Sequence, residues 1–271
     1  LDVPVDQVVI RVGDTAHLAY GVGTYASRSG VTAGNAAAMA AVQVREKAVT
    51  LAAAALEVPL HDLEWVDGRA SVRGSPDRGL DLKQLAGLAA PHRMPPGVDL
   101  APSLEATAYF VPETVTFAGG VHAAVVEVDP DTGRVHILRY VVAHDCGRLI
   151  NPRLVDGQIQ GGVVHGIGNA LYERMVFDEA ATPLSVNYGE YLLSASMESP
   201  KVEIHHLETP STVNPIGVKG AGEGGTIPAA ACIISGIEDA LSPFGIRISE
   251  HPVSPARILE LVRTARGAQA T

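Results

Sequence analysis

A glycine-rich loop that leads directly into an apolar helix is the strongest constraint in this chain. Glycines at 217, 220, 222, 224 and 225 surround one carboxylate, Glu223, and an apolar run from Pro228 to Leu241 follows at once. Glycine permits positive φ and lets a ligand approach the backbone closely, and the N–H groups at the start of a helix attract anions. A carboxylate held between these features suits a catalytic base beside an anionic cofactor, although many loops of this kind are plain turns.

Composition narrows the classes of protein and partner. The chain has 271 residues, of which 46% are hydrophobic and 18% charged, so a sizeable core is available. Its formal net charge is −10 and it has no basic run, which argues against nucleic acid as a partner. Cys146 and Cys232 are the two cysteines and neither stands in a Cys-x-x-Cys pair, so the pattern favours neither a disulfide framework nor an iron–sulfur or zinc site.

Neither a leader peptide nor a membrane-spanning segment is indicated by the sequence. No uninterrupted apolar stretch is long enough to span a bilayer, and the first residues do not resemble a signal peptide. The chain opens with Leu1 and not with Met. We therefore expect a processed, truncated or incompletely represented chain.

The order of local patterns predicts a mixed α/β (α+β) fold in two parts. In the first part we expect a strand after Pro4, a long helix from Ser29 or Thr32 to about Leu56, a hairpin turning at 67–68 and a short helix over 81–90. The stretch 91–102 is rich in Pro and Gly and marks the expected boundary, which gives subdomains at 1–95 and 96–271.

The second part alternates strands with helices. Residues 104–111 and 120–129 alternate apolar and polar side chains as strands do, and a turn at 129–133 leads back into a strand over 134–143. We expect helices over 154–174 and 255–266 and a strand over 201–207. The helix over 154–174 carries five glycines, which predict close approach of another backbone or a ligand.

Two groups of polar residues are further candidates for ligand contacts. Thr24, Ser27 and Ser29 offer hydroxyls and Arg28 a cation at the front of the long helix, where phosphate or pterin oxygens would fit. An ordinary helix cap would look the same. Gln158 offers both donors and an acceptor, with a polar residue in a helix interface as the alternative.

The histidines do not form a persuasive metal site in the sequence. His205 and His206 are neighbours on a predicted strand, so their side chains point to opposite faces. His144 and Cys146 could share a face, but they lack a second pair of ligands. We therefore expect no metal held directly by protein side chains.

Three ordered stretches carry a resemblance to a known family. Along the chain they are the run Gly-Thr-Tyr-Ala-Ser-Arg-Ser at 23–29, the run Asp-Cys-Gly…Asn-Pro…Gly-Gln…Gly-Gly across 145–162, and the run Lys-Gly-Ala-Gly-Glu-Gly-Gly-Thr at 219–226. They resemble the cofactor segments of the molybdenum hydroxylases, the family of xanthine dehydrogenase, aldehyde oxidoreductase and aerobic carbon monoxide dehydrogenase. One departure is the Pro-Ala-Ala-Ala at 228–231, where the family more often has Gly-Ala-Pro-Pro.

The resemblance implies a role for each matched residue. It makes Glu223 the catalytic base and the fold the C-terminal portion of a molybdopterin-binding domain, from either a split or a truncated large subunit. The cofactor would be molybdopterin cytosine dinucleotide, with molybdenum held by the pterin dithiolene. The residues expected to bind it are Thr24, Ser27, Arg28, Ser29, Asn151, Gln158, Lys219, Gly220 and Gly222.

The implied reaction is oxidative hydroxylation with water as the source of oxygen. An aldehyde, an N-heterocycle or CO would be the substrate, and electrons would pass to Fe–S clusters and FAD on partner subunits. The expected assembly is a hetero-oligomer that includes the upstream half of the molybdopterin subunit, an iron–sulfur subunit and an FAD subunit. We expect it in the cytoplasm, or at a membrane through its partners. The alternatives are a non-catalytic scaffold or remnant of such an assembly, and a free-standing domain that binds a phosphate ligand.

Overall fold

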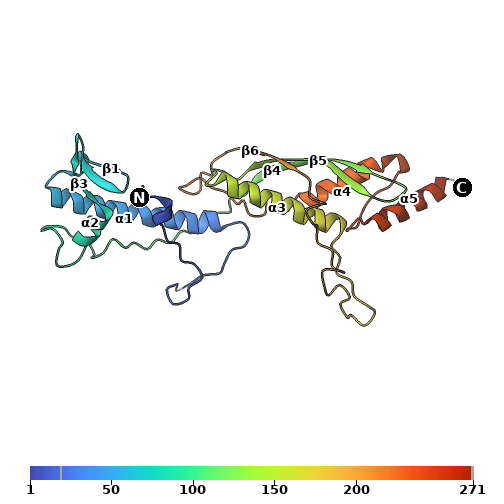
Figure 1. The fold of residues 1–271 in the computed structure, drawn as a ribbon, viewed down its shortest axis with the longest axis horizontal. Helices are drawn as coiled ribbons and strands as arrows, with labels where there is room; N and C mark the ends of the chain where they lie inside the picture. The colour runs from blue at the N-terminus through green and yellow to red at the C-terminus, as the bar shows by residue number, and fades with distance from the viewer. Residues whose placement is uncertain (19, 270–271) are drawn as a thin grey trace. The chain divides into compact units, whose positions relative to one another are not determined.

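The chain divides into two compact units, each described here by itself (Figure 1). The computed structural model describes residues 1–18 and 20–269. The first unit contains Leu1–Gly23 and Thr32–Pro112, and the second contains Thr24–Val31 and Glu113–Thr271. These bounds do not coincide with the expected boundary at 95/96. The segment 24–31 belongs with the second unit because Ser27 hydrogen-bonds Glu223; the cofactor-binding role of each part stays a prediction.

The first unit packs a long helix against a small sheet. The predicted helix is confirmed as α1 (Ser29–Leu56), which begins in the second unit and continues in the first. The predicted hairpin is also confirmed, as β1 (Leu63–Val66) and β2 (Arg69–Val72), and β3 (Ser75–Asp81) completes an antiparallel sheet in the order β1-β2-β3. The helix α2 (Leu82–Leu88) follows a capping box of Asp81 and Gln84. Leu51, Leu63 and Leu85 lie at the centre of this core.

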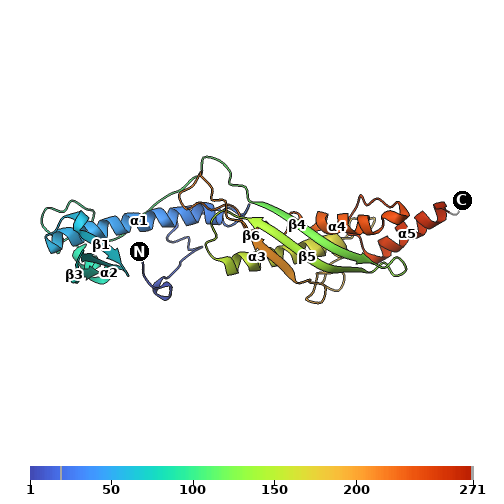
Figure 2. The same cartoon turned by 90° about the horizontal axis from the view of Figure 1, so that it is seen from above.

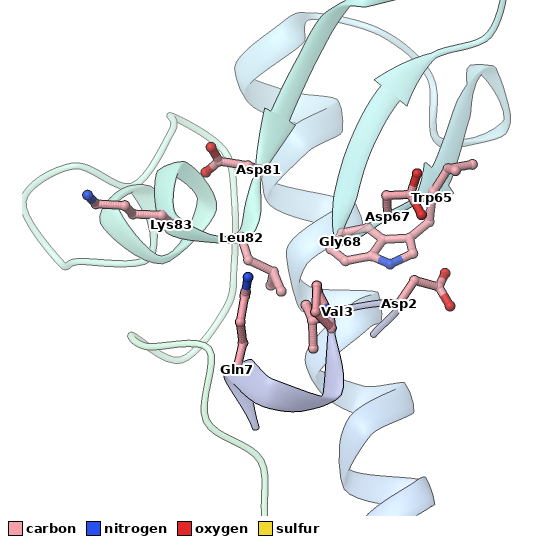
Figure 3. A pocket seen from close by; sticks show the side chains of 11 residues that line it. Asp2, Val3, Gln7, Trp65, Asp67, Gly68, Asp81, Leu82 and Lys83 are labelled. Carbon is pink, nitrogen blue, oxygen red and sulfur yellow. The ribbon is translucent and has the colours of Figure 1, made fainter. Parts of the chain in front are cut away.

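A shallow hollow on the first unit lies beside the hairpin (Figure 3). Its walls come from the first residues, from the turn between β1 and β2, and from the start of α2. Trp65 Nε1 donates a hydrogen bond to the carbonyl of Leu1 at 3.1 Å, and Gly68 leaves room for the side chain of Val3. None of the predicted site residues lines this hollow.

Two predicted strands are absent from the described residues. Residues 8–14 form no strand after the short 3-10 helix η1 (Val5–Gln7), and residues 104–111 are irregular. Val9 is 78% exposed and Tyr109 is 81% exposed, so the apolar members of each alternation are not buried. A strand needs a neighbouring strand to satisfy its backbone, and neither segment has one within the described residues.

The second unit is a three-stranded sheet with helices on one face. The strands are β4 (Gly119–Val128), β5 (Val135–Asp145) and β6 (Val202–His206), in the order β4-β5-β6, with β4 antiparallel and β6 parallel to β5. The helices α3 (Pro152–Leu171) and α4 (Ala229–Ala240) cover one face, as Figures 1 and 2 together show. The helix α5 (Pro255–Gln269) follows. The expected mixed α/β class is confirmed.

Short 3-10 turns complete the elements. They are η2 (Leu60–Asp62) after α1 and η3 (Ser242–Phe244) after α4. Ile167, Ile233, Ile237 and Ile258 meet in the core of the second unit beneath the sheet residues Tyr140 and Val142. Among residues 1–18 and 20–269, no helix combines the length and the apolar character that crossing a membrane would need.

Glycines bring α3 close to the loop and helix that follow Glu223. A Cβ on Gly162 would lie 2.7 Å from the backbone of residues 225–226, and one on Gly166 would overlap the side chain of Ala229. The predicted close approach is therefore confirmed at these two positions. At Gly157 and Gly161 an added Cβ would meet nothing within 4 Å, so no described backbone approaches them and close approach of a ligand stays a prediction.

Candidate cofactor and catalytic site

Ser27 orients the carboxylate of Glu223 although 196 residues separate them in the sequence. The Ser27 hydroxyl donates to Oε2 of Glu223 at 2.6 Å and accepts from the backbone N–H of Glu223 at 2.9 Å. Ala26 and Ser27 have φ of 51° and 52°. Positive φ costs a residue with a side chain roughly 1 kcal/mol, and such strain concentrates at functional sites. The backbone of 26–27 is thus bent in a way that presents this hydroxyl to Glu223.

The glycines of the loop are explained by what lies against them. Gly220 and Gly222 pack on Ser27, and an added Cβ would lie 3.0 Å from Ser27 Cβ at Gly220 and 3.3 Å from Ser27 Oγ at Gly222. A Cβ on Gly224 would overlap the ring of His144, and one on Gly225 would lie 2.8 Å from Cα of Ile159. The loop therefore packs against the 24–29 segment, the sheet and α3.

Gln158 contacts the same loop from α3. Its Nε2 donates to the carbonyl oxygen of Gly222 at 3.0 Å. This bond uses one amide donor, and the carbonyl oxygen of Gln158 stays available to a ligand. The structure thus places Gln158 beside Glu223, and its contact with a cofactor stays a prediction.

Lys219 forms a largely buried ion pair with Asp145. Nζ of Lys219 lies 3.2 Å from Oδ2 of Asp145, and the two side chains are 18% and 14% exposed. Burial raises the pKa of Asp145, but hydrogen bonds from Thr209, from the N–H of Gly147 and from Lys219 outweigh it and lower the pKa to about 2. The N–H of Lys219 also donates to the carbonyl of Cys146 at 2.7 Å. These contacts anchor the start of the loop to the end of β5.

Two hollows open on either side of the loop, and both lie within the second unit. The larger, here called the carboxylate hollow, has a volume of about 500 Å³ and contains Glu223 in its wall. Its lining comprises Ala26, Ser27, Thr116, Phe117, Ala118, Gly119, Gly120, His144, Gly220, Glu223, Gly224, Ile227 and Pro228. The smaller, here called the hydroxyl hollow, has a volume of about 180 Å³. Its lining comprises Thr24, Ser27, Ser29, Gly30, Cys146, Arg148, Ile150, Val155, Val218, Lys219, Ala221 and Gly222.

Three of the predicted cofactor residues, Gln158, Asn151 and Arg28, line neither hollow. Asn151 caps α3, where its Oδ1 accepts from the N–H of Leu154 at 3.3 Å. The guanidinium of Arg28 lies 4.1 Å from the centre of the Tyr25 ring. The hydroxyl of Ser29, in contrast, faces the hydroxyl hollow and donates to Thr24 at 2.9 Å.

Sequence reasoning missed three contributors to the site. His144 lines the carboxylate hollow but was considered only as a weak zinc ligand. Asp145 forms the ion pair with Lys219, and residues 116–120 form a wall of the carboxylate hollow. Alternation along β5 was an available signal for His144, because it lies on the same face as the buried Tyr140 and Val142. No sequence signal was available for the wall at 116–120.

The donor set of the hydroxyl hollow fits an anionic cofactor. It combines the hydroxyls of Thr24 and Ser29 with the cations of Lys219 and Arg148, beside the first turn of α1. Phosphate and pterin oxygens are bound by such donors and by helix N-termini. In the described part of the chain, no group of three or more His, Cys, Asp or Glu residues could hold a metal ion. Binding of the metal through the pterin stays a prediction.

The fold and these two hollows define a cofactor-binding protein with a candidate base beside the cofactor, and comparison with known proteins specifies which kind. A family model described as a molybdopterin cofactor-binding domain matches residues 1–200. The nicotine 6-hydroxylase large subunit of Paenarthrobacter nicotinovorans is 38% identical over 269 residues, which are 98% of this chain and 32% of that one. The carbon monoxide dehydrogenase large chain of Afipia carboxidovorans is 37% identical over 240 residues, 89% of this chain and 29% of that one.

Solved structures agree with these relatives. A reconstituted CO dehydrogenase from Oligotropha carboxidovorans superimposes with a TM-score of 0.85 at 33% identity, covering 94% of this chain and 31% of that one. Quinoline 2-oxidoreductase from Pseudomonas putida 86 gives a TM-score of 0.80 at 37% identity, covering 90% of this chain and 31% of that one. The chain belongs to the molybdopterin cofactor-binding domain family of the molybdenum hydroxylases, as the resemblance implied. It spans about a third of the length of these relatives.

Proposed function

We propose that this chain supplies the catalytic base and one wall of the cofactor site of a molybdenum hydroxylase. The observation that carries the proposal is the orientation of Glu223 by Ser27 at the junction of the two hollows. One hollow offers donors for an anionic cofactor, and the other offers a carboxylate to a substrate. The scaffold alternative does not account for a carboxylate that accepts a hydrogen bond from a hydroxyl whose oxygen also accepts from the backbone N–H of the same residue.

The hydroxyl hollow is the proposed place where this chain contacts part of molybdopterin, in its cytosine dinucleotide form. Thr24, Ser29 and Lys219 would hold its oxygens, and the glycines at 220 and 222 let the cofactor approach the loop backbone. Gln158 would hydrogen-bond the cofactor with the amide oxygen that Gly222 leaves available. When bound, the cofactor supplies the two-electron acceptor for the reaction.

Glu223 acts as the general base. Its Oε2 is occupied by the hydroxyl of Ser27, which fixes the plane of the carboxylate while Oε1 is available to the carboxylate hollow. A positioned base contributes roughly 10²- to 10⁴-fold to a rate. The proton that Glu223 removes belongs to the water that becomes the hydroxyl group of the product.

An N-heterocycle is the substrate class that the carboxylate hollow favours. Its volume of about 500 Å³ suits a ring system, and Phe117 and Ile227 give it apolar walls that are 80% and 75% exposed. Two of the relatives are named for nicotine and quinoline, which are N-heterocycles. Aldehyde and CO remain the other candidates.

The proposed assembly is a hetero-oligomer. Relatives are named as a large subunit, a large chain and the gamma subunit of a dehydrogenase complex. We infer that the rest of the molybdopterin subunit, an iron–sulfur subunit and an FAD subunit complete the electron path, and that the complex is cytoplasmic.

The test is Glu223→Gln in the full-length protein, purified with its native partners. We expect molybdenum to stay near one atom per copy while kcat on an N-heterocycle falls by roughly 10²-fold or more, because the amide cannot accept the proton. Glu179→Gln is the matched control, since Glu179 is exposed and lies in neither hollow. Retained turnover in Glu223→Gln, or an unsubstituted protein without molybdenum, would refute the proposal.

A further inference from the structure

Three histidines occupy neighbouring positions on the helix-covered face of the sheet, one from each strand. His144 of β5 pairs in register with His206 of β6, and His122 of β4 pairs with Val142, two residues before His144. His144 is 1% exposed, and its ring forms part of the lining of the carboxylate hollow. The absence of a side chain at Gly224 makes room for this ring.

His144 and His206 together contain three buried ring nitrogens that have no hydrogen-bond partner among the described residues. They are both nitrogens of His144 and Nδ1 of His206. Buried polar atoms are nearly always hydrogen-bonded. Because no described residue supplies a partner, water is the expected bridge between these nitrogens. The strand register sets His144 and His206 side by side, and His144 lies in the wall of the carboxylate hollow.

His206 connects these rings to solvent. Nε2 of His206 lies 2.6 Å from Oδ1 of Asp156 on α3, and the side chain of Asp156 is 51% exposed. Nδ1 of His122 lies 2.8 Å from the hydroxyl of Tyr140, which is fully buried. His144, His206 and Asp156 therefore lead from the hollow to the surface.

We propose that His144 and His206 form a proton-transfer row that returns Glu223 to its carboxylate form after each turnover. The inference rests on the proposed function, in which Glu223 removes one proton in every cycle. Glu223 and His144 line the same hollow, so the proton that Glu223 gains can pass to His144 within it. Both ring nitrogens of His144, and Nδ1 of His206, are available for such a transfer.

The transfer balances one proton in against one proton out. The O–H bond of the protonated Glu223 breaks and an N–H bond forms on one nitrogen of His144, directly or through a water in the hollow. The opposite nitrogen of His144 releases its proton to Nδ1 of His206. Nε2 of His206 then releases its proton to Asp156, which loses it to solvent. No electron moves and no other reactant is needed.

The charges around His144 keep it neutral and able to accept a proton. Burial lowers its pKa most, and His206 lowers it further, whereas Asp145 raises it. His122 on β4 and Glu223 in the loop are the other ionisable groups that face it. A neutral imidazole has one protonated and one unprotonated nitrogen, which is the form that a relay requires.

The test uses His144→Gln and His206→Gln in the full-length protein with its partners. We expect kcat to fall by roughly 10-fold or more with molybdenum content unchanged, as for loss of a positioned proton carrier, and added imidazole to restore it. A packing defect would not be rescued by a small proton carrier. His205→Gln is the matched control, because His205 lies beside His206 on β6 but is exposed on the opposite face.

A crystal structure of the unsubstituted protein gives a readout that does not depend on activity. We expect hydrogen bonds or ordered waters to link the nitrogens of His144 and His206. Rings with no such link, unchanged kcat in both variants, or a loss that imidazole does not rescue would overturn the inference. If His144→Gln loses molybdenum through misfolding, His206→Gln decides. Full activity of Glu223→Gln would instead refute the proposed function, while an inactive Glu223→Gln with active histidine variants would refute only the row.

Discussion

Removing the hydroxyl of Ser27 tests the geometry on which the proposed base depends. In Ser27→Ala, Glu223 loses the hydrogen bond to Oε2 at 2.6 Å and its backbone N–H loses an acceptor at 2.9 Å. A hydrogen bond to a charged group contributes about 1.5–3 kcal/mol and a neutral one about 1 kcal/mol. Ser27 is half-buried, so in the variant hydrogen bonds from water replace part of the energy of both lost bonds.

The activation free energy should rise by the part of this hydrogen-bond energy that stabilises the transition state. We estimate about 1.4–2.7 kcal/mol, which corresponds to a fall in kcat of roughly 10- to 100-fold. KM should change little, because the carboxylate is misoriented and not removed. The assay is steady-state kinetics of the full-length protein with its partners, alongside molybdenum content and thermal unfolding.

A second substitution at the same position separates orientation from backbone strain. Ser27→Gly removes the same hydroxyl but relieves φ of 52°, so it should be about 0.5–1 kcal/mol more stable than Ser27→Ala. Both variants should lose activity to a similar extent. A kcat within twofold of the unsubstituted protein in Ser27→Ala would refute the reasoning, as would a loss explained entirely by missing molybdenum.

Three further predictions follow from single contacts. Gly224→Ala places a Cβ on the ring of His144 and should lower stability by about 1–3 kcal/mol, whereas Gly157→Ala meets nothing and should be neutral or stabilising in thermal unfolding. The pKa of Asp145 is lowered from 3.8 to about 2; its stabilisation is therefore complete above pH 4 and lost as pH falls toward 2, and an Asp145→Asn variant should lack this dependence in acid unfolding. Lys219→Met should lower molybdenum content measured by metal analysis, and full loading would contradict a role in holding the cofactor.

Several elements could be predicted because their signals are local. The long helix ends at Leu56, before Val58 and Pro59, as the restriction on residues before proline requires. The turn at Asp67-Gly68 and the cap at Asp81 likewise depend on the backbone preferences of a few neighbouring residues. Such preferences act within a few positions, so they can be recognised without knowledge of the fold.

The strands predicted after Pro4 and over 104–111 were wrong for the opposite reason. Their alternation satisfied the sequence pattern, but a strand exists only where another backbone pairs with it. Val9 and Tyr109 are exposed, and no described strand runs beside them. Pairing is a property of the whole fold and leaves no mark in the strand itself.

In the candidate site, too, some features follow from local sequence and others depend on the whole fold. By itself, the sequence determined the chemistry of the loop. One carboxylate, five glycines and a following apolar helix together predict a close backbone approach around Glu223. The tertiary structure alone decided the partners of that carboxylate, because Ser27 is 196 residues away and His144 comes from the sheet. Contacts between distant segments depend on how helices and strands pack, and side-chain packing in three dimensions has no counterpart in the spacing of residues along the chain.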